Sequence, residues 1–227
     1  MTPYNALEKD ILPTSMGDLA IAFLGHASLR IAFGGKEIYA DPFHETADYS
    51  KLPKADWILV THQHLDHFDP QAIAAIRTDK TQILCTAACA GKLPGGIVMR
   101  NGESRTIGGI PVEAVPAYNL VHKRPNGQPF HLPGEGNGYI LAFGDQRLYI
   151  AGDTENIPEM KSFGKIDIAF LPVNLPYTMS VEMAADAARM IRPRILYPYH
   201  FSDTDLSRLV DLLKAEKGIE LRLRKMA

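Results

Sequence analysis

The sequence has few cysteines and no long apolar run, and each shortage excludes a class of protein. Only two cysteines occur among 227 residues, Cys85 and Cys89, and they form no CxxC motif. A disulfide framework or a cysteine-ligated zinc site is therefore disfavoured, and we expect reduced thiols, as in a cytosolic protein. No apolar run approaches the about 20 residues that cross a membrane, and the opening residues lack the basic and apolar regions of a signal peptide. The predicted location is the cytoplasm, without a membrane partner.

The chain also has no large excess of positive or of negative charge. The chain has 24 Lys and Arg against 26 Asp and Glu, a formal net charge of −2, and a sequence pI of about 6.4. Because no basic field would attract a polyanion, we expect no nucleic-acid partner. The hydrophobic content of 46% and the charged content of 22% are ordinary for a globular protein. No linker or repeat divides the chain, so we predict a single domain over residues 1–227.

The most informative segment is a cluster of histidines. The run Thr61-His62-Gln63-His64-Leu65-Asp66-His67 contains three of the chain's eight histidines and one carboxylate. The apolar residues Trp57-Ile58-Leu59-Val60 before it predict a buried strand, and Asp69-Pro70 after it predicts a capped helix start. The cluster is therefore predicted to lie on the loop at the carboxyl end of a strand, where a rigid scaffold commonly holds metal or catalytic groups.

Imidazole and carboxylate are ligands of Zn, Mn and Fe ions. Four such groups this close in sequence cannot all reach one ion without severe backbone strain. We therefore assign His62 and His64 to one metal, and Asp66 and His67 to a second metal about 3.5–4 Å away. The alternative is a polar surface loop that happens to be rich in histidine, which the buried strand before the cluster disfavours.

Two further candidates follow predicted strands elsewhere in the chain. Asp153 comes after Leu148-Tyr149-Ile150-Ala151, and its two carboxylate oxygens could bridge two metals. Its alternative role is that of a turn or capping residue. His200 follows Ile195-Leu196-Tyr197-Pro198-Tyr199, and its alternative role is that of a structural histidine near the core. The segment from Tyr118 to Gly138 has the Pro- and Gly-rich composition of a long loop, and such loops are commonly functional or mobile.

Hydrophobic periodicity places strands and helices in both halves of the chain. We read this as an α/β (α+β) fold in which two sheets pack face to face with helices outside, a four-layer αββα sandwich. The predicted strands are 19–24, 29–33, 37–40, 57–61, 82–85, 98–99, 104–107, 112–115, 138–143, 147–150, 166–171 and 195–199. The predicted helices are 70–77, a short one near 87, 181–191, and 205–214 ended by Gly218.

These motifs together resemble the metallo-β-lactamase fold superfamily. Its signature is an Asp after an early strand, an HxHxDH run, a third His, a bridging Asp and a last His. Asp41, the run from His62 to His67, Asp153 and His200 occupy four of these places. The chain also resembles one branch of that superfamily, the small bacterial metal-dependent hydrolases that include ascorbate-phosphate lactonases. This likeness is in four more segments, residues 24–29, 151–154, 171–173 and 177–179.

The place of the third histidine differs from the superfamily pattern. After Pro116-Ala117 the chain has Tyr118-Asn119, and an amide oxygen is a weaker ligand than imidazole for a borderline metal. His131 is our candidate substitute. His122 is the second candidate, and we expect it to face solvent instead. One metal or two can therefore be argued from the sequence.

The resemblance implies a role for each matched residue. Two divalent ions are expected, with Zn preferred over Mn or Fe, and Asp41 is expected to orient a ligand histidine through its other ring nitrogen. His26 is expected to contact the substrate or a metal-bound group. The predicted metal ligands are His62, His64, Asp66, His67, His131, Asp153 and His200, the predicted catalytic residues are Asp66, His26 and Asp41, and the predicted substrate contacts are Tyr118, Asn119 and Tyr177.

The predicted reaction is hydrolysis of a small ester, lactone or phosphodiester by a metal-bound hydroxide. A nuclease of the same fold is an alternative, which the missing basic patch disfavours. A non-catalytic metal-binding protein is another, which the retained Asp66 and Asp153 disfavour, since a passive site needs no open coordination position. The expected partner is a small-molecule substrate, and the sequence leaves a homo-oligomer open.

Overall fold

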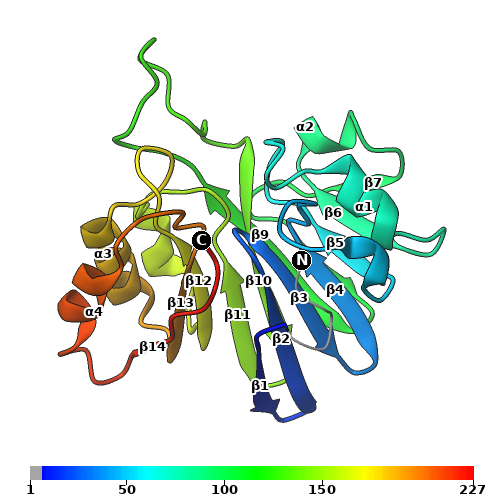
Figure 1. Ribbon diagram of the computed structural model, residues 1–227, viewed down its shortest axis with the longest axis horizontal. Helices are drawn as coiled ribbons and strands as arrows, with labels where there is room; N and C mark the ends of the chain where they lie inside the picture. Colours follow the sequence, from blue (N-terminus) through cyan, green and yellow to red (C-terminus); the bar gives the residue numbers. More distant parts are fainter. Residues whose placement is uncertain (1–6) are drawn as a thin grey trace.

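The computed structural model describes residues 7–227 and consists of two seven-stranded sheets packed face to face, with helices on their outer faces (Figure 1). The predicted four-layer αββα sandwich is confirmed. Residues 1–6, which carry part of the expectation of a chain without a signal peptide, lie outside the described range. No helix in the described part of the chain is both long and apolar enough to cross a membrane.

The first sheet contains seven strands in chain order. Neighbouring strands are antiparallel from β1 to β4 and parallel from β4 to β7. The strands are β1 (Lys9–Thr14), β2 (Gly17–Gly25), β3 (Ser28–Phe33), β4 (Lys36–Ala40), β5 (Trp57–Leu59), β6 (Gln82–Cys85) and β7 (Gly96–Val98).

The second sheet repeats this plan with the later half of the chain. Its strands are antiparallel from β8 to β11 and parallel from β11 to β14. They are β8 (Ser104–Ile107), β9 (Ile110–Ala117), β10 (Gly136–Phe143), β11 (Gln146–Ile150), β12 (Ile168–Pro172), β13 (Ile195–Tyr199) and β14 (Glu220–Leu221).

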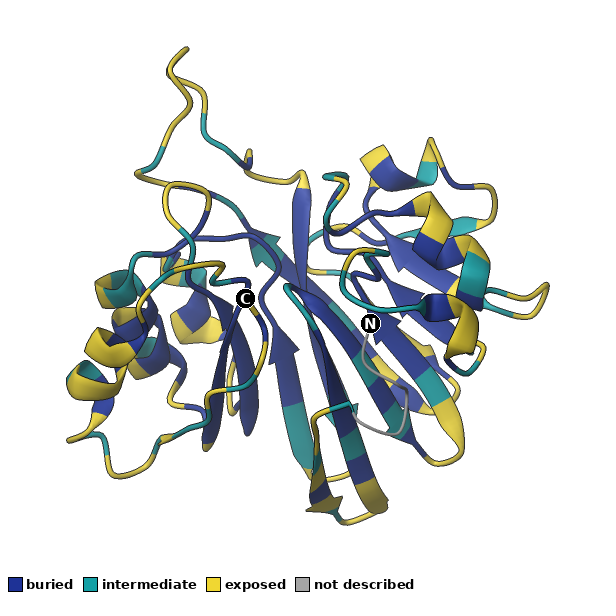
Figure 2. Ribbon diagram, in the orientation of Figure 1, coloured by how far each residue is buried: buried dark blue, intermediate teal, exposed yellow. Residues whose placement is uncertain are grey.

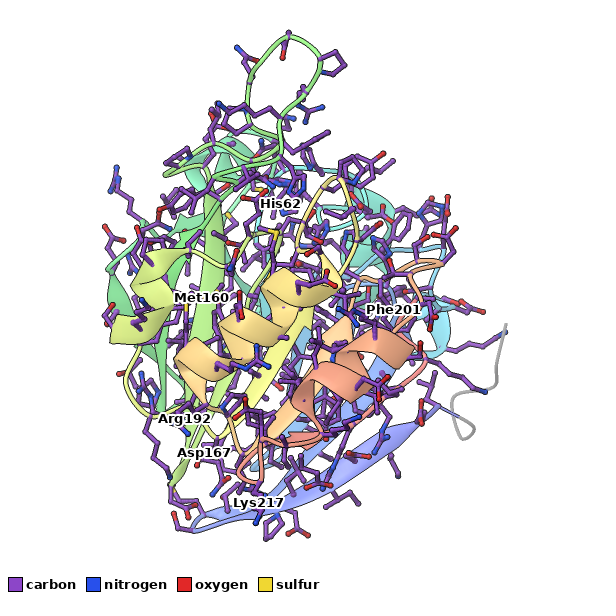
Figure 3. The ribbon with its side chains drawn as sticks, turned by 90° about the vertical axis from the view of Figure 1, so that its left-hand side faces the viewer. His62, Met160, Asp167, Arg192, Phe201 and Lys217 are labelled. Atoms are coloured by element: carbon purple, nitrogen blue, oxygen red, sulfur yellow. The ribbon has the colours of Figure 1, made fainter. Side chains whose placement is uncertain are left out.

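The helices cover the outer faces of the two sheets. α1 (Pro70–Ile76) and α2 (Ala87–Ala90) pack on the first sheet (Figure 1). α3 (Val181–Ile191) and α4 (Ser207–Leu213) pack on the second, and Figure 3 views the molecule from their side. Short 3-10 helices span Tyr49–Lys51 and Pro158–Ser162. Each helix turns its buried residues to a sheet and its exposed residues to solvent (Figure 2).

Strand periodicity divides the apolar residues among three cores. On β11, Leu148 and Ile150 face the core between the sheets, whereas Tyr149 faces the core beneath α3 and α4. This is the period of two of a strand buried on both faces. The third core lies between the first sheet and α1 and α2, and it contains both free cysteines, Cys85 and Cys89.

Local sequence explains several element boundaries. Gly34 and Gly35, at φ +56° and +75°, form the tight turn between β3 and β4, as their sequence predicts. Asp69 caps α1 by accepting from the backbone N–H of Gln71, and Ser180 caps α3 by accepting from that of Met183.

Several details differ from the sequence prediction, and three of them have a clear cause. β1 was not predicted, because it is an edge strand that contains a proline, Pro13, and pairs on one side with β2. β14 was missed because two residues carry no readable pattern. α4 ends at Leu213, so Gly218 lies beyond the helix and does not terminate it.

The parallel strands determine where the functional groups meet. β4 pairs in parallel with β5, and β11, β12 and β13 pair in parallel with one another, so their carboxyl ends lie at one edge of each sheet. At this edge the two sheets are joined, because the backbone N–H of Asn137 donates to the carbonyl of Thr61. Loops at such carboxyl ends are the usual place for a ligand. The segment between β9 and β10 projects beyond the body of the molecule (Figure 1, green).

Candidate metal centre

The histidine run follows β5 on a loop anchored by Asp41. The backbone N–H of Thr61 donates to Asp41 Oδ1 at 2.8 Å, and the Thr61 hydroxyl donates to Asp41 Oδ2 at 2.7 Å. The loop then turns back, with the N–H groups of His67 and Phe68 both donating to the carbonyl of His64. Asp41, at the end of β4, therefore sets the exit direction of the whole run.

The first group of converging side chains contains His62, His64, His131 and Asp153. Their nearest ligand atoms lie within 4.8 Å of one another. His64 Nδ1 is 3.0 Å from His62 Nε2 and 3.2 Å from His131 Nε2, and Asp153 Oδ2 is 3.3 Å from His131 Nε2. The structure therefore places His131 where the third histidine was sought. His62 lies close to the base of the projecting segment (Figure 3).

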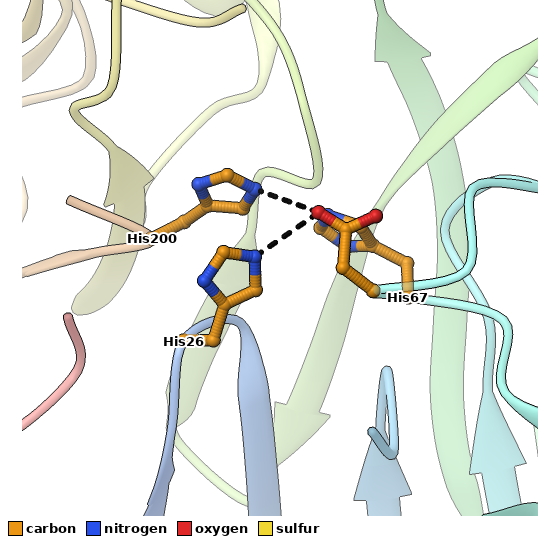
Figure 4. A group of neighbouring side chains, drawn as sticks. His26, His67 and His200 are labelled. Carbon is orange, nitrogen blue, oxygen red and sulfur yellow. Dashed lines mark hydrogen bonds and ion pairs between the residues drawn. The ribbon is translucent and has the colours of Figure 1, made fainter. Parts of the chain in front are cut away.

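The second group contains Asp66, His67, His200 and, in addition, His26. Asp66 Oδ2 is 3.1 Å from His26 Nε2, 3.6 Å from His200 Nε2 and 3.7 Å from His67 Nε2, as Figure 4 shows for the first two. His26 comes from the turn between β2 and β3, and its ring lies 3.8 Å from that of His200, measured between centroids. Sequence reasoning placed His26 near the site but did not place it among these four.

Asp153 lies between the two groups. Its Oδ2 faces His131 of the first group at 3.3 Å, and its Oδ1 is 3.3 Å from His67 Nε2 and 3.5 Å from His200 Nε2 of the second. Gly152 allows the chain to place Asp153 between the groups. Its φ is +64°, and a Cβ at this residue would lie 2.9 Å from the carbonyl oxygen of Asn137. A carboxylate with one oxygen in each group is arranged as a bridge.

Hydrogen bonds fix the tautomers of three histidines. His131 Nδ1 lies 2.8 Å from Asn119 Oδ1, and His67 Nδ1 lies 2.8 Å from Asp41 Oδ2. Both partners are acceptors, so each Nδ1 carries the proton. The Thr61 hydroxyl donates to Asp41 and therefore accepts from His62 Nδ1, at 3.1 Å. In each neutral ring the Nε2 lone pair consequently faces the centre, as metal ligation requires.

Buried polar atoms without partners show that the donor set fits cations. His67 Nε2, His200 Nε2 and Asp153 Oδ1 are all buried and make no hydrogen bond within the described chain. Leaving such an atom unpaired costs about 1–3 kcal/mol, and more when the group is charged. Imidazole nitrogens and carboxylate oxygens within ligand distance of one another are a suitable set for divalent transition-metal ions.

The pKa values of the first group's histidines shift in the opposite direction to that of His67. Burial lowers the pKa of His62 and of His64, and it lowers the pKa of His131 to about 4, so these imidazoles remain neutral ligands near pH 7. Burial also disfavours charge on His67, but Asp153 and Asp41 outweigh it and raise the pKa of His67 to about 10. The carboxylates therefore favour positive charge at the centre.

Strained backbone is concentrated at the centre. Among the described residues, five other than glycine have a positive φ, and three of these are His26 (+52°), Asp41 (+44°) and His200 (+49°). The left-handed conformation costs such a residue of order 1–2 kcal/mol. The His26–His200 pair is further held by the backbone, since the N–H of His200 donates to the carbonyl of His26.

A buried glutamate that the sequence analysis did not single out organises the projecting segment. Glu155 is fully buried and accepts from the backbone N–H groups of Leu120, Val121 and His122. It also lies 2.6 Å from His122 Nδ1, so His122, whose side chain is 27% exposed, is held by Glu155 and does not join the metal groups. An acidic residue two positions after Asp153 was the only sequence signal for this role.

Asn119 and Tyr118 differ from their predicted role as substrate contacts. Asn119 is buried, and both ends of its amide are occupied, since Oδ1 accepts from His131 and Nδ2 donates to Glu155 and to the carbonyl of Tyr177. The Tyr118 hydroxyl donates to Glu159, away from the centre. Asn119 thus orients His131 and does not replace it.

A cavity of about 410 Å³ opens over both groups, a size that suits a small molecule. Tyr177 is the predicted substrate contact that lines it. Arg124, Phe130 and Asn174 also line it, and the sequence analysis had assigned none of them to the site. The remaining lining residues are His26, His64, Asp66, His131, Asp153 and His200.

Comparison with known proteins identifies the family. Residues 20–200 match the model of the β-lactamase superfamily domain. The chain belongs to the metallo-β-lactamase superfamily. The chain is 33% identical to the UPF0173 metal-dependent hydrolase of Pyrococcus abyssi over 80% of this chain and 84% of that protein. It is 30% identical to the UPF0173 metal-dependent hydrolase of Pelotomaculum thermopropionicum, over 81% and 85%.

Two solved structures are similar to this chain. A protein of Parabacteroides distasonis assigned to the metal-dependent hydrolases is 48% identical, with a TM-score of 0.93 over 97% of this chain and 100% of that chain. A metallo hydrolase of Ignicoccus hospitalis has a TM-score of 0.76 over 92% and 96%, at 21% identity, which shows the fold alone.

Proposed function

We propose that this protein is a dinuclear metal-dependent hydrolase of a small ester, lactone or phosphodiester. The observation that carries the proposal is the position of Asp153, with one carboxylate oxygen in each of two adjacent groups. The buried, unpaired ligand atoms support it, as do relatives that are themselves named metal-dependent hydrolases. Zinc is the proposed metal because imidazoles dominate both groups, with Mn or Fe as alternatives.

In this proposal His62, His64 and His131 would hold the first ion, Asp66, His67 and His200 would hold the second, and Asp153 would be available to both. When bound, the ions lower the pKa of a coordinated water and polarise the bond under attack. Asp41 orients His67 through its Nδ1 proton, and Asn119 orients His131 in the same way. His26 holds the Asp66 carboxylate in place from the cavity wall.

The cavity favours a small substrate over a nucleic acid. Arg124 is the only Lys or Arg that lines it in the described chain, whereas a polynucleotide site needs several phosphate-binding cations. We propose a small-molecule substrate, no nucleic-acid or membrane partner, and a cytoplasmic location. Asp66 supports catalysis over passive metal storage, because its side chain is 38% exposed and lines the open cavity.

The test is the metal content of the purified protein, of Asp153→Ala and of Asp66→Ala, measured by elemental mass spectrometry beside ester and lactone hydrolysis. We expect about two equivalents in the parent protein and a loss of metal and activity together in both variants. Asp203→Ala, an exposed change outside both groups, is the matched control.

A single equivalent in the parent protein would exclude the dinuclear form. Full metal and full activity in Asp66→Ala would remove Asp66 from the centre. Absence of metal even after reconstitution would overturn the proposed function as a whole.

A further inference from the structure

Arg124 lines the cavity as a cation that has no acidic partner among residues 7–227. Its guanidinium contacts Phe130 twice, by donating to the carbonyl oxygen at 3.2 Å and by lying 5.0 Å from the ring centroid. No carboxylate of the described chain forms an ion pair with it, in contrast to Arg222 and Arg224, which both pair with Asp10. At least some of the five N–H donors of Arg124 are therefore available to a ligand.

The projecting segment is built to hold Arg124 in place. Its backbone N–H donates to the carbonyl of Gln128 at 2.7 Å, its carbonyl accepts from Gly127 at 2.9 Å, and Lys123 pairs with Pro129 in an isolated bridge. The root of the segment is held by the buried carboxylate of Glu155. The guanidinium is thus presented by a closed turn over the cavity.

An aromatic wall lies beside the cation. The rings of Phe130 and Tyr177 meet edge to face, with centroids 5.2 Å apart and planes at 77°. Tyr177 is 47% exposed, and both residues line the cavity that the two metal groups share. One cavity of the described chain therefore contains both metal groups, an aromatic wall and one guanidinium without a carboxylate partner.

We propose that Arg124 binds an oxyanionic group of the substrate, a carboxylate or a phosphate, while the planar or apolar body of the substrate packs on Phe130 and Tyr177. The planar guanidinium fork matches both oxyanions, and the hydrogen-bonded turn that carries Arg124 limits the backbone freedom lost on binding. The proposal rests on the hydrolase function proposed above, of which it names the substrate class.

The first experiment measures binding without turnover. Isothermal titration calorimetry would compare benzoate, phenyl phosphate and the neutral benzyl alcohol on the zinc-loaded protein and on Arg124→Gln. Hydrogen bonds between charged groups are stronger than those between neutral groups. We therefore expect Arg124→Gln to bind the two anions about 10- to 100-fold more weakly than the parent protein and to bind benzyl alcohol with unchanged affinity. Whichever anion loses more affinity identifies the group that the site prefers.

Arg105→Gln provides the matched control, since Arg105 is an exposed arginine of β8 outside the cavity. Arg124→Lys should retain part of the affinity, because it keeps the charge but loses the fork. Equal binding of both anions to the parent protein and Arg124→Gln, with normal circular dichroism and metal content, would overturn the inference.

The second experiment separates this inference from the hydrolase function. Phenyl acetate, 4-acetoxybenzoate and 4-acetoxyphenyl phosphate share one scissile ester and differ in charge. We expect a higher kcat/KM for the anionic esters and loss of that preference, about 10-fold or more, in Arg124→Gln. Hydrolysis of all three at rates that Arg124→Gln leaves unchanged would refute the inference and keep the hydrolase. Arg124-dependent binding without any turnover would refute ester hydrolysis and keep the anion site.

Discussion

The orientation of His131 depends on one amide group. Asn119 Oδ1 accepts from both the backbone N–H and Nδ1 of His131, while its Nδ2 is held by Glu155 and by the carbonyl of Tyr177. Asn119 therefore holds the ring of His131, which lies twelve residues further along the chain. Removing such supporting partners commonly lowers metal affinity.

We predict that Asn119→Ala lowers the affinity of the first metal group about 10- to 100-fold, because His131 loses both its tautomer and its orientation. Titration of the metal-free protein with zinc against a chelator would measure this. Asn126→Ala, at the exposed tip of the same segment, should leave the affinity unchanged. Unaltered zinc affinity in Asn119→Ala would show that His131 does not need this support.

At the scale of elements, the turn after β11 places the Asp153 carboxylate between the two side-chain groups. Gly152 has φ +64°, and a Cβ there would lie 2.9 Å from the carbonyl oxygen of Asn137 and 3.0 Å from the Cβ of Thr61. Its N–H donates to the Tyr199 hydroxyl of β13. One glycine therefore allows β11, β10 and the histidine loop to approach closely enough for Asp153 to reach both groups.

We predict that Gly152→Ala lowers the free energy of unfolding by about 2 kcal/mol or more, through positive-φ strain and the two close contacts, and lowers metal content as well. Denaturant unfolding and elemental analysis would measure the two effects. Gly127→Ala separates the causes, since Gly127 has φ +84° but open space around it. If Gly152→Ala lowers the free energy of unfolding no more than Gly127→Ala does, the close contacts of the added Cβ contribute nothing.

At the scale of the molecule, both sheets contribute to one core. Trp57 of β5 packs in it, and its ring lies against Gly108 in the turn between β8 and β9, so closely that a Cβ on Gly108 would lie 2.1 Å from it. The chain's only tryptophan therefore reports on the junction between the first and the second sheet.

We predict that residues 1–227 unfold as one domain, because neither sheet can bury its inner face alone. Tryptophan fluorescence and far-ultraviolet circular dichroism should give coincident denaturant transitions in the metal-free protein. Two separated transitions would indicate that the halves fold independently.

A second long-range connection joins the first strand to the C-terminal residues. Asp10 of β1 accepts from Tyr197 of β13 and from Arg222 and Arg224, and its side chain is 12% exposed. Burial alone would raise the pKa of Asp10, but these hydrogen bonds outweigh burial and hold the pKa below its ordinary value of 3.8. The stabilisation is therefore full well above pH 3.8 and is lost as the pH falls through the lowered native pKa.

We predict that Asp10→Asn costs about 2 kcal/mol of unfolding free energy at pH 6, and that the difference from the parent protein shrinks below pH 3.8. Urea unfolding at several pH values would measure it. Asp211→Asn on α4, whose ion pair is exposed, should change stability by less than about 0.5 kcal/mol. A difference that is independent of pH would contradict the assigned role of the Asp10 charge.

Local sequence determined much of this protein by itself. Apolar periodicity, caps and paired glycines predicted most strands, α1, α3 and the αββα layers, because these signals act between residues close in the chain. The run from His62 to His67, Asp153 and His200 were predicted as ligands because each follows a predicted strand. The structure shows that these strands pair in parallel with their neighbours, so their carboxyl ends lie together.

Only the tertiary structure decided how the centre is completed. His131 lies beside His64 across 67 residues of chain, Glu155 holds His122 away from the centre, and His26 reaches Asp66 from another turn. The same holds for Arg124. It lies in a loop rich in Pro and Gly, and that composition gave no sign that Arg124 lines the cavity. Such contacts form only when the two sheets and the long segment pack together. The spacing of residues within one stretch of sequence does not determine the distance between atoms that are far apart in the chain.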